Sequence, residues 1–224
     1  MIPKISKMTI LYCIFMGNCK QKFRLMKILK YILFAIVGLA IIFFAFGFIK
    51  PTVNYGHEIT VSKSVEEAWA VTQDDSKYHL WLEGFKSIEL ISGESGEVGS
   101  KYKVLVNPGE GQPDFEMIET LVSIEEFDHV DLHFDSDMMD FDQKMLFSDA
   151  NGEVKVRTES TVTGKNLIMR SMFAIMETFG GSFQAQEEIN IEALKKVIEE
   201  NTTDYYPEPE VVEIEEVAEE GDGE

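Results

Sequence analysis

The chain has 224 residues, with 20 basic and 40 acidic side chains, so its formal net charge is −20. This length predicts one ordinary domain, and so negative a surface excludes the phosphate-neutralising mode of nucleic-acid binding. The two cysteines, Cys13 and Cys19, both precede the first long apolar stretch. The rest of the chain therefore cannot form a disulfide, a thiolate nucleophile or a cysteine metal site.

Residues 31–49 form an uncharged apolar stretch of 19 residues. At about 1.5 Å per residue, a helix of this length nearly matches a hydrocarbon core of about 30 Å, which predicts a single transmembrane anchor. The preceding residues contain no acid and seven bases: Lys4, Lys7, Lys20, Lys22, Arg24, Lys27 and Lys30. By the positive-inside rule, residues 1–30 are cytoplasmic and the rest is extracytoplasmic, in a periplasm or at the cell surface.

A cleaved signal peptide is the alternative interpretation of this stretch. It would need a shorter apolar region and a small-residue cleavage site, and residues 46–51 offer none. We therefore favour an uncleaved signal anchor. Met26 could itself be the start, in which case residues 1–25 are not native.

After the anchor, residues 53–61 alternate between apolar and polar side chains, which predicts a strand. Ser64 and Glu67 have the spacing of a capping box at the start of a short helix. A second short amphipathic turn, residues 78–82, ends at Gly84.

The remainder of the domain is predicted to contain a run of strands and a terminal helix. Turn residues separate six further strands, giving a seven-stranded antiparallel sheet: 85–92, 101–106, 115–127, 129–136, 140–147 and 154–163. Residues 166–200 carry apolar side chains at three-to-four spacing, which predicts one long amphipathic helix lying across the sheet. The last segment, 205–224, is acidic and without bases, and is predicted to be a disordered tail.

The α+β order of one strand, two short helices, six strands and a long helix resembles the helix-grip fold of the START-like, or SRPBCC, superfamily. This superfamily includes polyketide cyclase/dehydrase and lipid-transport proteins. The resemblance covers residues 52–204 and is carried by five strings: Ile59-Thr60-Val61, SVEEAWAV at 64–71, YHLW at 78–81, FKSIE at 85–89 and GEVGSKY at 96–102. Ser64 stands where proline is usual, and Leu82-Glu83-Gly84 replaces a common proline-containing stretch.

The resemblance implies a cavity between the sheet and the terminal helix, which we expect to bind a hydrophobic or lipid-like ligand. The candidate lining residues are Trp81, Tyr102, Val104, Met117, Phe141, Met145, Phe147, Met172, Met176, Phe179 and Phe183. Methionine is flexible, so a methionine-rich wall adapts readily to a lipid-like molecule. The alternative is that these side chains fill a solid core. Gly180 and Gly181 interrupt the helix as a candidate gate, or as a close approach to a neighbouring turn.

Candidate chemistry is sparse. Four polar side chains alternate along one predicted strand, at His129, Asp131, His133 and Asp135, and could bind a divalent ion. Their strict alternation with apolar residues is more typical of a solvent-facing strand surface, paired with Asp142 and Lys144 of the next strand. We predict no metal and no cofactor. Glu119 or Tyr102 could act in a cavity, but the alternation around Glu119 is mixed, so no catalytic residue is assigned.

Three functions remain open from the sequence. The first is a membrane-anchored domain that binds a hydrophobic small molecule. The second is a cyclase- or dehydrase-type enzyme, which would need an ionisable group inside the cavity. The third is an acidic protein-interaction or co-chaperone-like module, which a filled core would favour. The ligand, any reaction and the oligomeric state are not fixed by the sequence.

Overall fold

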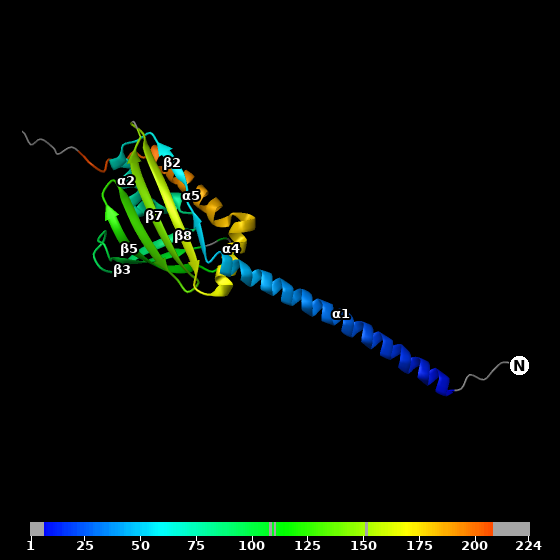
Figure 1. Ribbon diagram of the computed structural model, residues 1–224. Coiled ribbons are helices and arrows are strands. Elements are labelled where there is room, and N and C mark those ends of the chain that lie inside the picture. The colour runs from blue at the N-terminus through cyan, green and yellow to red at the C-terminus, as the bar shows by residue number, and fades with distance from the viewer. Residues whose placement is uncertain (1–6, 108, 110, 151, 208–224) are drawn as a thin grey trace, which may run out of the picture.

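The computed structural model describes residues 7–107, 109, 111–150 and 152–207, with side chains from residue 24 onward. Cys13, Cys19 and the acidic segment 208–224 therefore lie outside the described side chains. In the described part a long helix, α1 (Lys7–Ile49), precedes one α+β domain (Figure 1).

The sheet has eight antiparallel strands, in the order β1-β8-β7-β6-β5-β4-β3, and β2 also pairs with β8. The strands are β1 (Thr52–Tyr55), β2 (Glu58–Val61), β3 (Phe85–Ser92), β4 (Lys101–Val106), β5 (Phe115–Glu125), β6 (His129–Asp135), β7 (Met139–Asp149) and β8 (Val154–Gly164). The antiparallel sheet and the C-terminal helix expected from the sequence are confirmed.

The predicted first strand, 53–61, is two strands because Gly56 and His57 interrupt it. A Cβ atom on Gly56 would lie 2.2 Å from the Thr158 carbonyl oxygen, so only glycine allows β8 to approach this closely. The His57 N–H donates to Thr158 Oγ1 at 3.1 Å, and the Thr158 N–H donates to the His57 carbonyl at 2.8 Å. β8 is thus paired with β1 or β2 along most of its length, on the edge that does not pair with β7.

Three short helical segments follow β2: α2 (Val65–Gln73), the 3₁₀ turn η1 (Asp75–Lys77) and α3 (Tyr78–Trp81). Ser64 caps α2 as predicted, since its side chain accepts from the Glu67 N–H. Glu67 does not complete the capping box. Its carboxylate instead accepts from Lys63 Nζ at 2.7 Å and from Asn201 Nδ2 at 3.1 Å, which joins α2 to the C-terminal end of the domain.

The single helix predicted over 166–200 is two helices, α4 (Leu167–Gly180) and α5 (Ser182–Glu199). Gly181 separates them with a φ of +56°, in the left-handed region that glycine enters without steric cost. Its N–H donates to the Glu177 carbonyl and closes α4. The prediction of one helix was wrong because the three-to-four spacing of apolar residues continues across the break and gives no sign of it.

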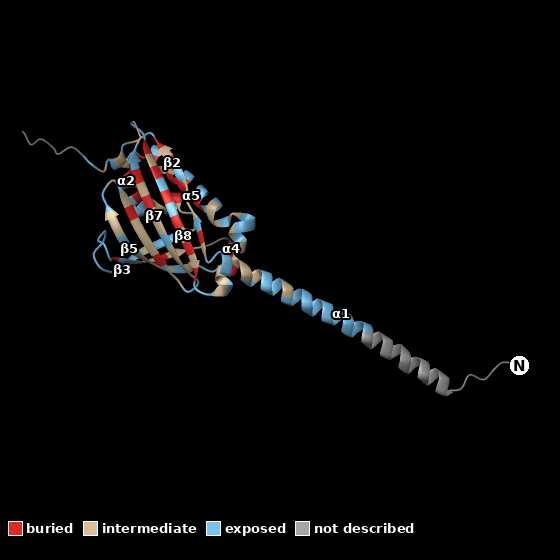
Figure 2. Cartoon of the chain, viewed as in Figure 1, coloured by how far each residue is buried: buried red, intermediate tan, exposed pale blue. Residues whose placement is uncertain are grey.

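The hydrophobic core has two clusters. The larger lies between β2, β5–β8, α2 and α5, and its centre includes Trp69, Phe147, Ile191, Leu194 and Ile198. The smaller contains Val53, Val162 and Phe173, where α4 meets β1 and β8. Buried residues run in bands along β7 and β8, whereas α1 is exposed over almost all of its described side chains (Figure 2).

Within α1, the segment Arg24–Ile49 is long and apolar enough to cross a membrane, a property that a signal sequence near an N-terminus shares. Its last turn packs on α4. The Phe46 and Phe179 rings lie 5.7 Å apart, and Lys50 Nζ donates to Thr178 Oγ1 at 3.2 Å. Gly47 touches α4 so closely that a Cβ atom there would lie 2.4 Å from Ser171 Oγ.

Tyr205 and Tyr206, the first two residues of the predicted disordered tail, still pack against the domain. Tyr205 Oη donates to Asp74 Oδ2 at 2.6 Å, and the Tyr206 ring lies 6.5 Å from that of Phe127. Asn201 supports this end, since its side chain accepts from Lys77 Nζ and from the Thr203 N–H.

Candidate ligand-binding cavity

A cavity of about 1120 Å³ lies between the inner face of the sheet and helices α3 and α5. Residues from β1, β3–β7, α2, η1, α3, α4 and α5 line it. It is larger than most small-molecule pockets, which measure about 300–1,000 Å³, and aromatic, aliphatic and methionine side chains make up most of its wall. The side chains between the sheet and the helices therefore do not form a solid core.

Eight of the eleven predicted lining residues do line this cavity: Trp81, Tyr102, Val104, Met117, Phe141, Met145, Met176 and Phe183. They come from α3, β4, β5, β7, α4 and α5, so the fold gathers them from most of the domain.

The other three predicted residues lie elsewhere. Phe147 is on the inner face of β7 but packs on Trp69 of α2, with ring centres 5.1 Å apart, where α2 closes that end of the sheet. Met172 packs against the smaller core cluster. Phe179 is 75% exposed and contacts Phe46. Gly180 and Gly181 do not line the cavity either, although Ser182 and Phe183 beside them do.

Aromatic rings form a continuous row along one wall. Phe134 on β6 stacks on Phe141 on β7 with centres 5.1 Å apart, and Phe141 lies 6.4 Å from Tyr55 on β1. Tyr55 in turn stacks on Phe183 of α5 at 5.6 Å. Such a wall offers a large apolar contact area at little conformational cost.

Glu119 points into the cavity from β5. Its register partners are Tyr102 on β4 and Phe134 on β6, and Met117 and Leu121 share its face. A β-bulge between Leu121 and Ser123 then reverses the alternation, which leaves Val122 exposed and returns Ile124 to the cavity. This bulge is the reason for the mixed pattern in the sequence.

Burial raises the pKa of Glu119 to about 7, because the cavity wall removes water from the carboxylate. Tyr78 on α3 stands nearby, and its pKa is also raised, first by burial and then by the charge of Glu119. At neutral pH the Glu119 carboxyl is therefore divided between its neutral and ionised forms.

Glu187 is a second cavity acid, on α5, and is only 6% exposed. Its carboxylate accepts from Gln143 Nε2 at 3.4 Å and from Ser160 Oγ at 3.5 Å. Burial raises its pKa, and burial together with Glu187 raises the pKa of Tyr55. The sequence reasoning missed Glu187, although its spacing of four residues from both Phe183 and Ile191 places it on the inward face of the helix.

The polar row on β6 does not converge on one point. Lys144 Nζ lies 3.3 Å from Asp131 Oδ1, His133 Nδ1 lies 2.7 Å from Asp142 Oδ1, and Lys165 pairs with Asp135. These contacts are separate side-chain pairs, two of them with the predicted partners on β7 and one with Lys165 just after β8. Side chains so engaged with neighbouring strands do not form a tetrahedral metal site.

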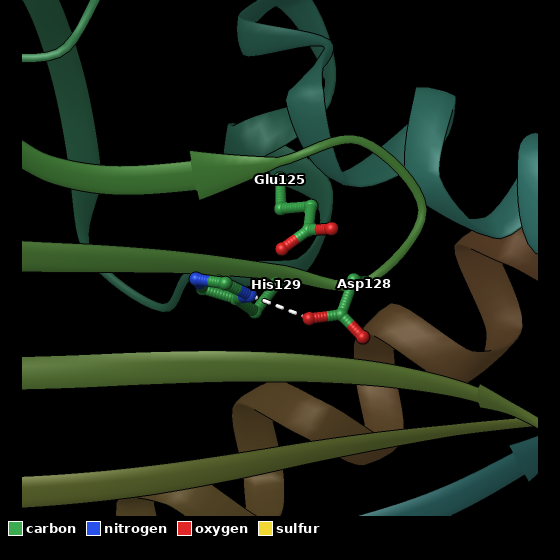
Figure 3. A group of neighbouring side chains, drawn as sticks. All are labelled: Glu125, Asp128 and His129. Atoms are coloured by element: carbon green, nitrogen blue, oxygen red, sulfur yellow. Dashed lines mark hydrogen bonds and ion pairs between the residues drawn. The ribbon is translucent and has the colours of Figure 1, made fainter.

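Three potential ligand groups do gather at the exposed turn between β5 and β6: Glu125, Asp128 and His129 (Figure 3). His129 Nδ1 lies 2.6 Å from Asp128 Oδ2, and its Nε2 is hydrogen-bonded to Ser123 Oγ at 3.2 Å. Both ring nitrogens are thus engaged within the protein, so the turn offers an ion little beyond two exposed carboxylates.

No family model matches the chain, and no curated protein sequence matches it. Solved structures do. TTHA0849 from Thermus thermophilus has a TM-score of 0.51 and 11% identity, covering 65% of this chain and 97% of its own. A conserved protein from Geobacillus kaustophilus has a TM-score of 0.51 and 16% identity, covering 65% and 95%. Truncated norcoclaurine synthase from Thalictrum flavum has a TM-score of 0.48 and 14% identity, covering 67% and 95%.

At these identities the likeness shows the fold alone. The TTHA0849 and Geobacillus structures match this chain over nearly their whole length, and the fold that they share with it is an antiparallel sheet with a long helical segment at the C-terminal end, of helix-grip type. The helix-grip arrangement expected from the sequence resemblance is confirmed at this level.

Proposed function

We propose that this protein binds a hydrophobic or amphipathic small molecule in the cavity between the sheet and α5, with α1 holding the domain at a membrane. The cavity is the observation that carries the proposal. Its volume of about 1120 Å³ and its wall of aromatic and methionine side chains suit a lipid-sized molecule. Each Å² of apolar ligand surface removed from water contributes about 25 cal/mol, so few polar anchors are needed.

The contact between α1 and α4 supports membrane placement. Phe46 lies one turn before the end of the apolar segment, and Phe179 of α4 touches it. Phe179 therefore lies near the level at which α1 leaves the bilayer. Ile168, Met176 and Phe179 present exposed apolar side chains along α4, as an interfacial helix would.

This arrangement also gives a route for the ligand. Met176 on α4 is 42% exposed and lines the cavity, as do Ser182 and Phe183 just beyond Gly181. The Gly180–Gly181 break is then a hinge at the membrane side of the cavity. If it gates entry, replacing both glycines by alanine slows ligand exchange; unchanged exchange in a double variant that still folds contradicts this role.

The test is to purify the full chain in lipid nanodiscs and identify co-purifying small molecules by native mass spectrometry. Met117→Trp places a large side chain in the cavity, and Val122→Trp, on the exposed face of the same strand, is the matched control. Recovery of one compound class, lost in Met117→Trp and kept in Val122→Trp, supports the proposal. An empty wild-type protein that takes up nothing from a lipid extract contradicts it.

An enzyme of the cyclase or dehydrase sort is a second candidate, and Glu119 is the observation that favours it. A half-buried carboxyl with a pKa raised to about 7 can both donate and accept a proton near neutral pH. If the recovered compound is a substrate, fresh protein converts it and Glu119→Gln binds it without converting it. A filled core would have favoured the third alternative, an acidic protein-interaction module. The core is not filled, so this alternative lacks that support.

A further inference from the structure

Glu119 has no hydrogen-bond partner among the described residues, which is unusual for a carboxyl on the inner face of a sheet. The groups that face it are Tyr102 from β4, Phe134 from β6 and Tyr78 from α3. Tyr102 Oη is already engaged, since it accepts from the Gly96 N–H at 2.8 Å. The half-buried Glu119 carboxylate therefore keeps its hydrogen-bonding capacity within the cavity, and the position in front of it is suited to a group of the ligand.

A second unmet polar atom lies at the same end of the cavity. Trp81 is 7% exposed, and its indole N–H has no hydrogen-bond partner in the described part of the protein. The Trp81 and Tyr78 rings are 5.8 Å apart, so Tyr78 connects Trp81 with Glu119. By contrast, the Glu187 carboxylate already accepts from Gln143 on β7 and Ser160 on β8 and so has its own partners.

The charges around the cavity are mostly negative. Asp75, Glu83, Glu119 and Glu187 line it, against one base, Lys86; Asp75, Glu83 and Lys86 are exposed, so the two acids inside the cavity are Glu119 and Glu187. A negatively charged ligand head would enter a poorly solvated space facing carboxylates, where like charges repel more strongly than in water.

We infer that the bound amphiphile has a hydrogen-bond-donating head, an amine or a hydroxyl, that contacts Glu119, and that the cavity rejects carboxylate and phosphate heads. This rests on the proposed function and names its ligand class. A hydroxyl can donate to Glu119 and also accept from the Trp81 N–H, whereas an ammonium can donate to Glu119 and compensate its charge but cannot accept from Trp81. The ligand chain then lies along the aromatic row from Phe134 to Phe183.

The experiment compares three probes with the same chain and different heads: decylamine, decanol and decanoate. Equilibrium dialysis against the full chain in phosphatidylcholine nanodiscs measures binding, and nanodiscs without protein measure partition into lipid. At about pH 8 the amine is cationic, decanoate is anionic and Glu119 is mostly ionised. Glu119→Gln removes the charge with little change of shape, and Glu116→Gln, on the exposed face of the same strand, is the matched control.

We expect decylamine and decanol to bind wild-type protein about tenfold or more tightly than decanoate, equivalent to about 1.4 kcal/mol. In Glu119→Gln the difference in affinity between decylamine and decanoate narrows to roughly threefold. Decanol still binds this variant, which shows that the variant is folded. Glu116→Gln behaves as wild type. Decanoate binding as tightly as decanol, or an unchanged gap in Glu119→Gln, overturns the inference and leaves the proposed function standing. Binding of none of the three overturns the proposed function itself.

Discussion

Replacing Glu119 by glutamine should stabilise the folded domain at alkaline pH and much less at acidic pH. The carboxyl has an ordinary pKa of 4.5 in the unfolded chain, and burial raises it to about 7 in the folded state. Below the unfolded value both states are protonated, and the group contributes nothing. As the pH rises from 4.5 to 7, the unfolded chain releases the proton while the folded domain keeps it, so stability falls.

The size of the effect follows from the shift. Each pKa unit corresponds to 1.36 kcal/mol, so a rise from 4.5 to about 7 gives a penalty of about 3 kcal/mol that is complete above pH ~7. Glutamine does not titrate and carries no such penalty. The stability gained by Glu119→Gln should therefore be about 3 kcal/mol greater at pH 8.5 than at pH 4.5.

Urea unfolding at several pH values measures this difference. Both tryptophans of the chain, Trp69 and Trp81, lie in the domain and report its unfolding by fluorescence. The full chain is held in amphipol, which adds no fluorescence, and Glu116→Gln serves as the exposed control. Tyr78, Tyr102, Asp75 and Lys86 line the same cavity and are common to wild type and both variants. If the gain of Glu119→Gln is equal at both pH values, Glu119 titrates as a solvated carboxyl, and the account of the cavity fails.

Three further substitutions test the helix contacts. Gly47→Val should separate α1 from α4, because the valine side chain would overlap Ser171, and hydrogen exchange in α4 should then become faster. The control is Gly38→Val, which should leave exchange unchanged because nothing lies within 4 Å of a Cβ atom at that position. Gly181→Ala should cost about 1 kcal/mol of unfolding free energy because alanine resists a φ of +56°, whereas Gly180→Ala in the α4 helix should cost nothing. Asn201→Ala, at a 9% exposed site bonded to Lys77 and Glu67, should lower unfolding free energy by about 1–3 kcal/mol; a loss below about 0.5 kcal/mol would contradict its structural role.

Alternation and turn chemistry were sufficient to predict the strands, because one face of an antiparallel sheet is buried and the other is wet. The bounds of β3 and β4 agree with the predicted ones, and those of β5–β8 differ by at most two residues. The facing of Glu119 could not be predicted, because the bulge at Val122 is fixed by pairing with β6 and leaves only an irregular pattern in the sequence.

The error at Phe179 in the predicted cavity lining has a clear cause. Phe179 and Phe183 are four residues apart, and a continuous helix would place both on one face. The left-handed Gly181 resets the helical phase between them, so Phe183 enters the cavity and Phe179 faces α1. The contact of Phe179 with Phe46 joins residues more than 130 positions apart, and no local pattern in either segment encodes it.

The pairing of β1 and β2 with β8 has a consequence for biosynthesis. Thr52 lies three residues beyond α1, yet its partner on β8 is Thr163, so the first strand made has no neighbour until the last strand has been synthesised. At about 5–20 residues per second, the ribosome needs roughly 5–20 s to reach that point. During this interval the nascent chain cannot close its sheet, so its β-forming segments are open to proteases and to chaperones. The sheet of this domain therefore cannot close before β8 is made, and truncation before residue 154 should leave a chain that is degraded.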